Sequence, residues 1–442
     1  MQQPNNFVRW FRQVAPYVHD FGGRTFVIGF GGEMVAERAR FASFIHDINL
    51  LAALEIRLAL VYGARPQIEA ELKAKGLKSH TAQGVRVTDA QALTVVKHAG
   101  GMLRVEIEAL LSQGLPNSPM ARAQIRSVSG NYITARPIGV RKGVDFQFTG
   151  AVRKVDAAAL SAHLDVADIV LVPFTGYSST GEVFNLAWED VAESVAVALR
   201  ADKLLMYTDK LPTNRKGEVV SELTADDAEA LAAAGKGKGT SNLTPAARRA
   251  LEHLARAVEN GVARGHLVTR RSPGSLLLEL FTHAGVGTMV TADPVEKLRP
   301  ARIDDVRGML ELIEPLEAEG MLVKRGRDTL EAEIGNFFVV EHDARIVGCA
   351  ALTPFPDEKS AEFACLAVAA NLRDAGTGER LLKACEERAK GLRLRKLFAL
   401  TTQAAHWFLE HGWRPASVEV LPESRKASYN PRRGSKVFLK RL

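Results

Sequence analysis

The sequence predicts an α/β protein built from more than one domain. Its 442 residues are too many for one compact core, so two or three domains are expected. In the first part, apolar runs typical of buried strands alternate with helical patterns, which favours a largely parallel sheet between helices. Two prolines mark a break at 293–300. We therefore expect a first domain over 1–292, a linker over 293–300 and a second domain over 299–442.

The composition is that of an ordinary globular protein, with 46% hydrophobic and 25% charged residues. The first residues lack the features of a secretory signal, and no apolar run is long enough to cross a membrane. The three cysteines, Cys349, Cys365 and Cys385, are odd in number and lack metal-type spacing. This pattern favours a reducing cytoplasm without disulfides or a metal site.

The net charge of +7 is concentrated at the end of the chain. Seven cationic and no acidic residues lie within 425–442, so the rest of the chain is formally neutral. A local cluster suits a small anionic substrate or cofactor better than a nucleic acid, which would need an extended basic surface. We expect neither a nucleic-acid partner nor a membrane.

The first domain is expected to begin with a helix that is followed by alternating strands and helices. Residues 7–20 carry apolar side chains at helical spacing, and this amphipathic helix could pack internally or reach a neighbouring subunit. Buried strands are predicted at 25–30 and 57–62. Further elements are expected as helices at 38–54, 66–75 and 89–111 and as strands near 125–140, 168–173, 203–208, 265–270 and 287–291.

Several short stretches of this first domain resemble the amino acid kinase family, and its acetylglutamate kinase branch in particular. The stretches are Val27-Ile-Gly-Phe-Gly-Gly, Tyr62-Gly-Ala-Arg-Pro-Gln, Gly84-Val-Arg-Val-Thr-Asp, Glu279-Leu-Phe-Thr and Gly285-Val-Gly-Thr. The resemblance implies a three-layer αβα sandwich.

The positions where that family transfers phosphate carry other residues here. By the resemblance, Gly29 and Ala246 stand in place of the two phosphate-binding lysines, and Glu189 in place of the aspartate that organises them. The phosphate loop reads Tyr62-Gly-Ala-Arg instead of His-Gly-Gly-Gly. Because phosphoryl transfer depends on positioning and charge neutralisation, these losses predict a kinase fold without kinase activity.

In arginine-sensitive members of the family, an N-terminal helix and the Glu-Leu-Phe-Thr region bind arginine and link dimers into a hexamer. The matching residues here are Tyr17, His266, Glu279, Gly285 and Gly287. A carboxylate can accept a guanidinium at two points, and glycine permits close approach of carbonyl groups. The resemblance implies inhibition by L-arginine and a homo-hexamer, a trimer of dimers. Alternatively, Glu279 simply pairs within its helix.

The second domain is organised around Phe363–Arg373 and the loop that follows. A strand-forming run leads into Arg-x-x-Gly-x-Gly, and a helical pattern begins after it. The first N–H groups of a helix are unpaired, and glycine lets an anion come close, so this loop could cradle an anion. A simple glycine-rich turn is the alternative, because short glycine motifs recur by chance.

The order of elements around this loop is similar to the GNAT acetyltransferase family, in which the motif holds the pyrophosphate of acetyl-CoA. The resemblance implies that acetyl-CoA is the co-substrate, with no metal. The implied contacts, of which Leu366 and Val368 act through their backbone, are Leu366, Val368, Arg373, Gly376, Thr377, Gly378 and Glu379.

Both domains in this order resemble the bacterial amino-acid N-acetyltransferase family over nearly the whole chain. Further matches are Glu314-Pro-Leu-Glu-Ala-Glu-Gly, Ala405-His-Trp-Phe-Leu-Glu-His-Gly-Trp and Tyr429-Asn-Pro-Arg-Arg-Gly-Ser-Lys. The resemblance implies acetyl transfer to the α-amine of L-glutamate, by direct attack in a ternary complex, as the first step of arginine biosynthesis.

The chemistry needs a base, because the amine arrives protonated, and Glu362 is placed for that role by its motif position. A surface glutamate at a strand end is the alternative. The carboxylates of the acceptor need cations, since guanidinium and ammonium groups bind carboxylates. The implied substrate-binding residues are Lys324, Arg325, Cys365, Arg433 and Lys436.

The oxyanion and the leaving thiolate need hydrogen-bond donors. Many GNAT enzymes use a tyrosine where this sequence has Phe408, so Thr401 or Thr402 is the expected substitute, with ordered water as the alternative. A covalent acetyl intermediate on Cys365 is a weaker route, because no His–Asp partner for the thiol is in view.

Two other functions remain open from the sequence. One is an active acetylglutamate kinase with an appended acetyltransferase, and the other is a non-enzymatic arginine sensor. Aspartate is also open as the acceptor, because the same cations would bind it.

Overall fold

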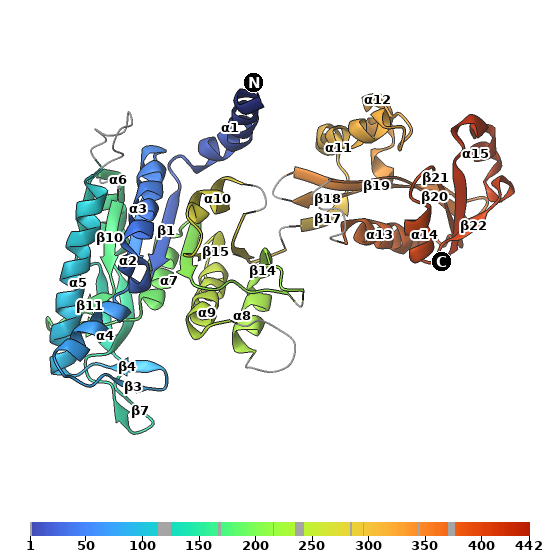
Figure 1. The fold of residues 1–442 in the computed structure, drawn as a ribbon. Coiled ribbons are helices and arrows are strands. Elements are labelled where there is room, and N and C mark those ends of the chain that lie inside the picture. The colour runs from blue at the N-terminus through green and yellow to red at the C-terminus, as the bar shows by residue number, and fades with distance from the viewer. Residues whose placement is uncertain are drawn as a thin grey trace. The chain divides into compact units, whose positions relative to one another are not determined.

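The computed structural model describes residues 2–113, 125–166, 169–214, 216–234, 243–282, 285–294, 296–342, 345–369 and 376–442. The chain divides into two compact units, Met1–Asp293 and Pro294–Leu442. Each unit has its own main sheet and its own hydrophobic clusters (Figure 1).

The N-terminal unit is built on an eight-stranded sheet of order β14-β16-β15-β13-β1-β2-β10-β5. Neighbouring strands run parallel except β15 and β16, which are antiparallel. The strands are β1 (Thr25–Phe30), β2 (Arg57–Tyr62), β5 (Ser127–Ser129), β10 (Ile169–Pro173), β13 (Lys203–Thr208), β14 (Glu222–Thr224), β15 (Arg264–Thr269) and β16 (Thr288–Thr291).

Helices cover both faces of this sheet, because alternate residues of each central strand point to opposite sides. In β1, Phe26, Ile28 and Phe30 pack in one cluster with α3 and α5, while Val27 packs in another with α7 and α9. This confirms the predicted three-layer sandwich. The helices of the unit are α1 (Gln2–Phe21), α2 (Gly32–Ala36), α3 (Arg38–Ala53), α4 (Arg65–Ala74), α5 (Ala90–Leu111), α6 (Ala157–Val166), α7 (Trp188–Leu199), α8 (Ala225–Ala233), α9 (Pro245–Glu259) and α10 (Ser275–Phe281).

Smaller sheets lie beside the main one. The expected strand at 125–140 is in fact several short strands joined by turns. A four-stranded sheet has the order β12-β11-β6-β9, and two hairpins pair β3 with β4 and β7 with β8. These strands are β3 (His80–Ala82), β4 (Val85–Val87), β6 (Ile133–Pro137), β7 (Val140–Arg141), β8 (Val144–Asp145), β9 (Gly150–Val155), β11 (Thr175–Tyr177) and β12 (Val183–Asn185).

Helix α1 begins five residues earlier than predicted and projects from its unit (Figure 1). Its C-terminal part packs on the core through Val14 and Phe21, which are buried. Phe7, Trp10 and Phe11 near its N-terminal end are at least half exposed. The helix therefore presents an apolar surface that its own unit leaves uncovered.

The C-terminal unit contains a seven-stranded sheet of order β17-β18-β19-β20-β21-β23-β22. All neighbours are antiparallel except β20 and β21. The strands are β17 (Glu296–Pro300), β18 (Phe337–His342), β19 (Arg345–Phe355), β20 (Ser360–Val368), β21 (Lys396–Thr401), β22 (Arg414–Ala416) and β23 (Lys436–Arg441).

Helices again cover both faces. Phe363 and Leu352 pack with α13 and α14 on one side, and Cys349 and Ala367 with α11 and α12 on the other. The segment 293–300, expected as a linker, contributes β17 to the sheet edge, so it is mostly ordered strand. The helices are α11 (Val306–Ala318), α12 (Arg327–Ala332), α13 (Thr377–Gly391), α14 (Ala405–Glu410) and α15 (Glu423–Ala427).

Candidate active site

The sheet of the C-terminal unit forks between β20 and β21. β21 pairs with β20 over Ser360–Glu362, whereas β19 pairs with β20 as far as Val368. From Phe363 on, the β21-facing edge of β20 has no strand partner among the described residues. Because backbone N–H and C=O groups need partners, an extended ligand can pair with this edge as an added strand would.

A β-bulge interrupts β20 inside this open stretch. The register with β19 shifts between Cys349 and Ala351, and Cys365 has a φ of +51°. A bulge bends the strand and redirects its backbone groups. Leu366 and Val368, which the GNAT resemblance implies as contacts of the acyl donor, follow the bulge and are half-buried.

Helix α13 begins directly beyond the open edge. Gly376 caps it with a φ of +81°, a left-handed conformation that favours glycine. A Cβ at Gly378 would meet Trp407 at 3.5 Å, an ordinary contact, so packing does not demand glycine there. The 15-residue helix directs its first N–H groups at this corner, where an anion is stabilised. Arg373, the first residue of the motif, lies outside the described residues.

The two other predicted donor contacts in this helix have different surroundings. Thr377 is buried, and its hydroxyl has no hydrogen-bond partner among the described residues. Glu379 is exposed and lies 3.2 Å from Nε2 of His411. The hydroxyl of Thr377 could therefore form a hydrogen bond with a ligand, whereas Glu379 contacts the side chain of His411.

Glu362, the predicted base, lies at the last paired position before the fork. Arg425 of α15 donates to both of its carboxylate oxygens, from Nε at 2.7 Å and from Nη2 at 3.0 Å. The two side chains are 12% and 21% exposed, so this bidentate pair is largely shielded from water. Hydrogen bonding to Glu362 is the main reason that the pKa of Arg425 is raised.

Thr401 and Thr402 follow at the end of β21. The hydroxyl of Thr401 accepts hydrogen bonds from the N–H groups of Gln403 and Ala404 at 3.3 and 2.9 Å, which caps the turn before α14. The hydroxyl of Thr402 is buried and has no partner among the described residues. Thr401 also pairs across the strands with Lys436, so a threonine hydroxyl and an ammonium group lie on neighbouring strands.

The other predicted acceptor contacts fall into two groups. Arg433 donates to the carbonyl groups of Gly320 and Met321 at 3.2 and 3.1 Å, which ties the C-terminal tail to the loop after α11. In that loop, Lys324 is exposed. Arg325 lies against the buried Cys365.

The environment of Cys365 is set by two neighbours. The Cys349 thiol and the Arg325 guanidinium lower the pKa of Cys365 against the opposing effect of burial. The side chain is 95% buried, since the residue is only 5% exposed. Cys365 is thus a buried side chain next to Arg325, one of the predicted acceptor contacts.

The predicted arginine contacts of the N-terminal unit form a separate buried cluster. Glu279 of α10 accepts hydrogen bonds from the N–H groups of Val286 and Gly287 at 2.8 and 2.7 Å. Its other oxygen lies 2.7 Å from Nδ1 of His266 on β15. A Cβ at Gly285 would meet Glu279 at 2.7 Å, which explains why glycine occurs there.

The charges of this cluster follow from its burial. Burial and the nearby Lys203 ammonium lower the pKa of His266 to about 4, although Glu279 opposes this. His266 is therefore neutral near pH 7. Burial opposes ionisation of Glu279, but His266 and the two backbone N–H groups together lower its pKa. A proton on Nδ1 of His266 then donates to Glu279, and Nε2 faces Lys203 at 3.5 Å.

Helix α1 contacts the same cluster at its C-terminal end. The Lys203 ammonium lies 5.1 Å from the ring centre of Phe21, within cation–π range. Tyr17 is half-buried, with its ring 6.0 Å from that of Phe21. The C-terminal part of α1 is thus connected to the His266–Glu279 pair through Phe21 and Lys203.

Comparisons with known proteins match both units. The amino acid kinase family matches residues 24–262, and the acetyltransferase (GNAT) domain matches residues 333–415. The amino-acid acetyltransferase of Ralstonia nicotianae is 48% identical over 442 residues, covering 100% of this chain and 96% of that protein. The amino-acid acetyltransferase of Azotobacter vinelandii is 46% identical, covering 99% of this chain and 100% of that protein. The chain belongs to the amino-acid acetyltransferase family.

Solved structures agree with this family. N-acetylglutamate synthase from Neisseria gonorrhoeae, complexed with coenzyme A and L-arginine, matches with a TM-score of 0.85 and 37% identity over 99% of both chains. The same enzyme complexed with coenzyme A and N-acetyl-glutamate matches with a TM-score of 0.62. The chain is therefore an amino-acid acetyltransferase with an amino acid kinase-like N-terminal unit and a GNAT C-terminal unit.

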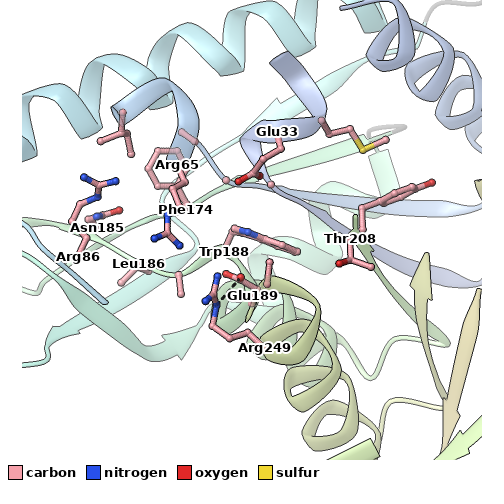
Figure 2. A pocket seen from close by; sticks show the side chains of 18 of the residues that line it. Glu33, Arg65, Arg86, Phe174, Asn185, Leu186, Trp188, Glu189, Thr208 and Arg249 are labelled. Atoms are coloured by element: carbon pink, nitrogen blue, oxygen red, sulfur yellow. Dashed lines mark hydrogen bonds and ion pairs between the residues drawn. The ribbon is translucent and has the colours of Figure 1, made fainter. Parts of the chain in front are cut away.

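In this amino-acid acetyltransferase, a cavity of about 350 Å³ lies in the N-terminal unit at the carboxyl ends of β1 and β2 (Figure 2). Ala246 and Glu189, which the resemblance matches to a lysine and an aspartate of the amino acid kinase family, line it. The ring of Trp188 packs on the glycines of both strand ends: a Cβ at Gly29 would meet it at 2.7 Å, and one at Gly63 closer still. An indole therefore fills the space beside the glycines.

Two residues at these sites were not predicted from the sequence. Arg425 was recognised as part of the basic tail, but its bidentate pairing with Glu362, 63 positions away, was not. Trp188 was not predicted to have any role. In both cases the partner lies far away in the sequence, and the contact became visible only in three dimensions.

The described residues contain neither a metal-binding cluster nor a membrane-spanning helix. In that part of the chain, no group of three or more His, Cys, Asp or Glu side chains could hold a metal ion. Within the same ranges, every helix is too short or too polar to span a bilayer.

Proposed function

We propose that the chain transfers the acetyl group of acetyl-CoA to the α-amine of L-glutamate and that L-arginine inhibits it. The observation that carries the proposal is the fork between β20 and β21. Its open edge extends from Glu362 to Val368, and α13 begins at Thr377, so the proposed base and the proposed anion site would lie at opposite ends of this edge.

Acetyl-CoA is the donor that suits this edge. Its pyrophosphate would lie at the first turn of α13, and its pantetheine arm would pair with the backbone of Leu366 and Val368. Arg373 would supply the cation of the motif. The solved relative complexed with coenzyme A supports this assignment.

A dicarboxylate amino acid suits the other end of the edge. Arg425 lies at Glu362, Lys436 pairs with Thr401, and Arg433 ties the tail to the loop that holds Arg325. Several cations around one position bind two carboxylates better than one. The relative complexed with N-acetyl-glutamate supports glutamate over aspartate as the acceptor.

Glu362 would accept a proton from the α-ammonium group, directly or through one water. The free amine then attacks the thioester carbonyl carbon, forming a C–N bond and a tetrahedral oxyanion. Collapse breaks the C–S bond, the amine nitrogen loses its second proton, and the leaving thiolate gains one. The hydroxyl of Thr402, which lacks a partner, and the hydroxyl of Thr401 are the donors proposed for the oxyanion or the thiolate.

For Glu362 to act as a base, its pair with Arg425 must loosen. A charge-assisted hydrogen bond contributes on the order of 1.5–3 kcal/mol. A carboxylate of the arriving acceptor can replace Glu362 on the guanidinium at little net cost, because one ion pair substitutes for another. Acceptor binding and release of the base would then be one event.

The N-terminal unit, residues 1–292, would regulate the enzyme. It would be an arginine-binding kinase fold without kinase activity. Tyr17, His266, Glu279, Gly285 and Gly287 are the proposed arginine contacts. The relative complexed with L-arginine supports an arginine site in this family. The indole packed on Gly29 and Gly63 speaks against phosphoryl transfer. The exposed apolar part of α1 is the proposed contact between subunits of a hexamer in the cytoplasm.

The deciding experiment measures CoA release from acetyl-CoA with each of the common amino acids, with and without arginine. Glutamate should give the highest kcat/KM, and arginine should lower its turnover. Faster turnover of aspartate or of an uncharged amino acid would overturn the acceptor assignment. Unchanged turnover at saturating arginine would overturn the proposed inhibition.

A further inference from the structure

The motif Glu314-Pro-Leu-Glu-Ala-Glu-Gly forms the end of α11 and the turn after it. Gly320 follows the helix with a φ of +73°, a left-handed conformation that is common just after the last turn. The loop 321–326 then leads to α12 and carries Lys324 and Arg325, two of the proposed acceptor contacts. The contacts that hold this loop therefore decide where the two cations lie.

Glu317, in the last turn of α11, holds the far part of this loop. Its carboxylate accepts a hydrogen bond from the backbone N–H of Arg325, with 2.7 Å between Oε1 and the nitrogen. Both residues are half-buried. A hydrogen bond to an ionised acceptor is shorter and stronger than one between neutral groups. Because this bond ends on the main chain, it fixes the point from which the Arg325 side chain extends and does not occupy the guanidinium.

The near part of the loop is held by other contacts. The N–H groups of Met321 and Leu322 donate to the carbonyl group of Leu316 at 2.9 and 3.1 Å. Arg433 of the tail donates to the carbonyl groups of Gly320 and Met321. Within the part of the chain that the structure describes, Glu317 is the only hydrogen-bond partner of the main chain at 323–325. The backbone position of Arg325 therefore depends on Glu317.

The side chain of Arg325 is directed at the bulge of β20, where its guanidinium contacts the thiol of Cys365. The proposed base lies on the same face of the sheet. Glu362 pairs with Thr353 of β19. Two positions along that strand, Ala351 packs in the same cluster as Cys365. Residues directly opposite each other share a face, and so do residues two positions apart. Arg325 and Glu362 can therefore contact the same ligand.

We propose that Glu317 is a positioning residue for the acceptor amino acid. By holding the main chain at Arg325, it places the guanidinium beside the bulge, where the guanidinium binds a carboxylate of the acceptor. Glu317 does not touch the acceptor itself. Its removal should therefore weaken acceptor binding and leave donor binding and the chemical step unchanged. This inference rests on the proposed role of Arg325 in binding the acceptor.

The test is steady-state CoA release by the full-length chain, with L-glutamate or acetyl-CoA varied in turn. Glu317→Ala should raise the KM for glutamate about tenfold, with kcat and the KM for acetyl-CoA within about threefold of wild type. Glu317→Met, which keeps the packing but has no oxygen, should show the same split. Glu317→Gln keeps a carbonyl oxygen for the N–H, so its KM for glutamate should stay within about threefold of wild type. Glu314→Ala, at an exposed position of the same motif, is the control and should behave as wild type.

Arg325→Ala separates this inference from the proposed function. An unchanged KM for glutamate in Arg325→Ala would overturn the acceptor role of Arg325, and the inference with it. A raised KM in Arg325→Ala but not in Glu317→Ala or Glu317→Met would overturn the inference alone.

A double variant tests whether Glu317 acts through Arg325. Added to Arg325→Ala, Glu317→Ala should change the KM for glutamate by less than about twofold, because a residue that acts through another has no effect once that residue is gone. Additive effects of the two substitutions would overturn the positioning role. A similar loss in kcat and in both KM values for Glu317→Ala would also overturn it, and would mean that Glu317 serves only the fold.

Discussion

Glu279 in the N-terminal unit and Glu362 in the C-terminal unit are both largely buried carboxylates, but their partners differ. Glu279 is held by two backbone N–H groups and by neutral His266, all of which belong to the folded core. Glu362 is held by one long side chain, Arg425, from a helix of five residues. The first carboxylate therefore cannot change partners without rearranging a loop, whereas the second needs one rotamer change.

This difference separates a structural carboxylate from one that can react. Although burial opposes ionisation, His266 and the backbone donors lower the pKa of Glu279 and favour its ionised form, which suits a binding role. A base must give up its hydrogen bonds and accept a proton during each turnover. Under the proposal above, Glu279 serves stability and regulation and Glu362 serves acetyl transfer, and four predictions test this division.

The largest effect is expected for Glu362→Gln. The amide cannot accept the proton, so kcat should fall by about 10²- to 10⁴-fold while the KM for acetyl-CoA changes little. Steady-state CoA release measures both constants. Glu423→Gln, at a side chain 87% exposed on the same short helix as Arg425, is the control and should retain activity. If Glu362→Gln kept more than a tenth of wild-type kcat, the base would have to be sought elsewhere.

The second prediction concerns pH. The folded pKa of His266 is about 4, below the unfolded value of about 6.5, so the unfolded state binds more protons between these values. The free energy of unfolding should therefore fall as the pH decreases from about 6.5 to about 4, by on the order of 3 kcal/mol at most. Urea denaturation between pH 7.5 and 5 measures the upper part of this loss.

The control for the pH effect is a second histidine. His266→Gln should flatten the dependence, and His80→Gln, at an exposed position in the same unit, should preserve it. A dependence that persists unchanged in His266→Gln would assign the loss to other groups.

The third prediction tests how tightly the loop at Glu279 is built. A Cβ at Gly287 would lie 2.5 Å from the carbonyl oxygen of Leu267 and 3.0 Å from Glu279. Gly287→Ala should cost about 1–3 kcal/mol in stability, because the backbone must shift. Gly101→Ala, inside α5 with open space around the added methyl group, should instead stabilise by about 0.5–1 kcal/mol. Thermal unfolding of both variants distinguishes these outcomes, and equal stability would mean that the loop is loose.

The smallest effect is expected for Cys365→Ala. The thiol is buried and the chemistry proposed above proceeds by direct attack, so kcat should stay within about threefold of wild type. Quenched-flow mass spectrometry should detect no acetylated chain. A loss of more than a hundredfold would instead support a covalent acetyl-cysteine.

Much of the fold was predictable from local pattern. Strands such as Thr25–Phe30 and helices such as Arg38–Ala53 match the expected ranges closely, because apolar periodicity reports burial directly. The segment 293–300 was predicted less well. Its prolines indicated a break, but Glu296–Pro300 forms an edge strand, where a missing N–H is tolerated.

The motifs of the candidate site were predictable from the sequence, but the contacts between their side chains were less so. Glu362 and the start of α13 follow from sequence order along one strand. The pairing of Glu362 with Arg425 and the packing of Trp188 on Gly29 depend on contacts between distant segments. Charge and aromatic patterns carry no information about such partners. The individual roles of the predicted contact residues therefore stay predictions.

The fork between β20 and β21 also has a mechanical consequence. Among the described residues, the edge of β20 beyond Glu362 has no strand partner, and a molecule lying along it would act as the missing strand. Donor binding would then make the C-terminal unit more rigid, because the donor would bridge the strands on the β20 side of the fork and those on the β21 side. Each release of product would remove this bridge, so the C-terminal unit would alternate between a flexible and a rigid state once per turnover.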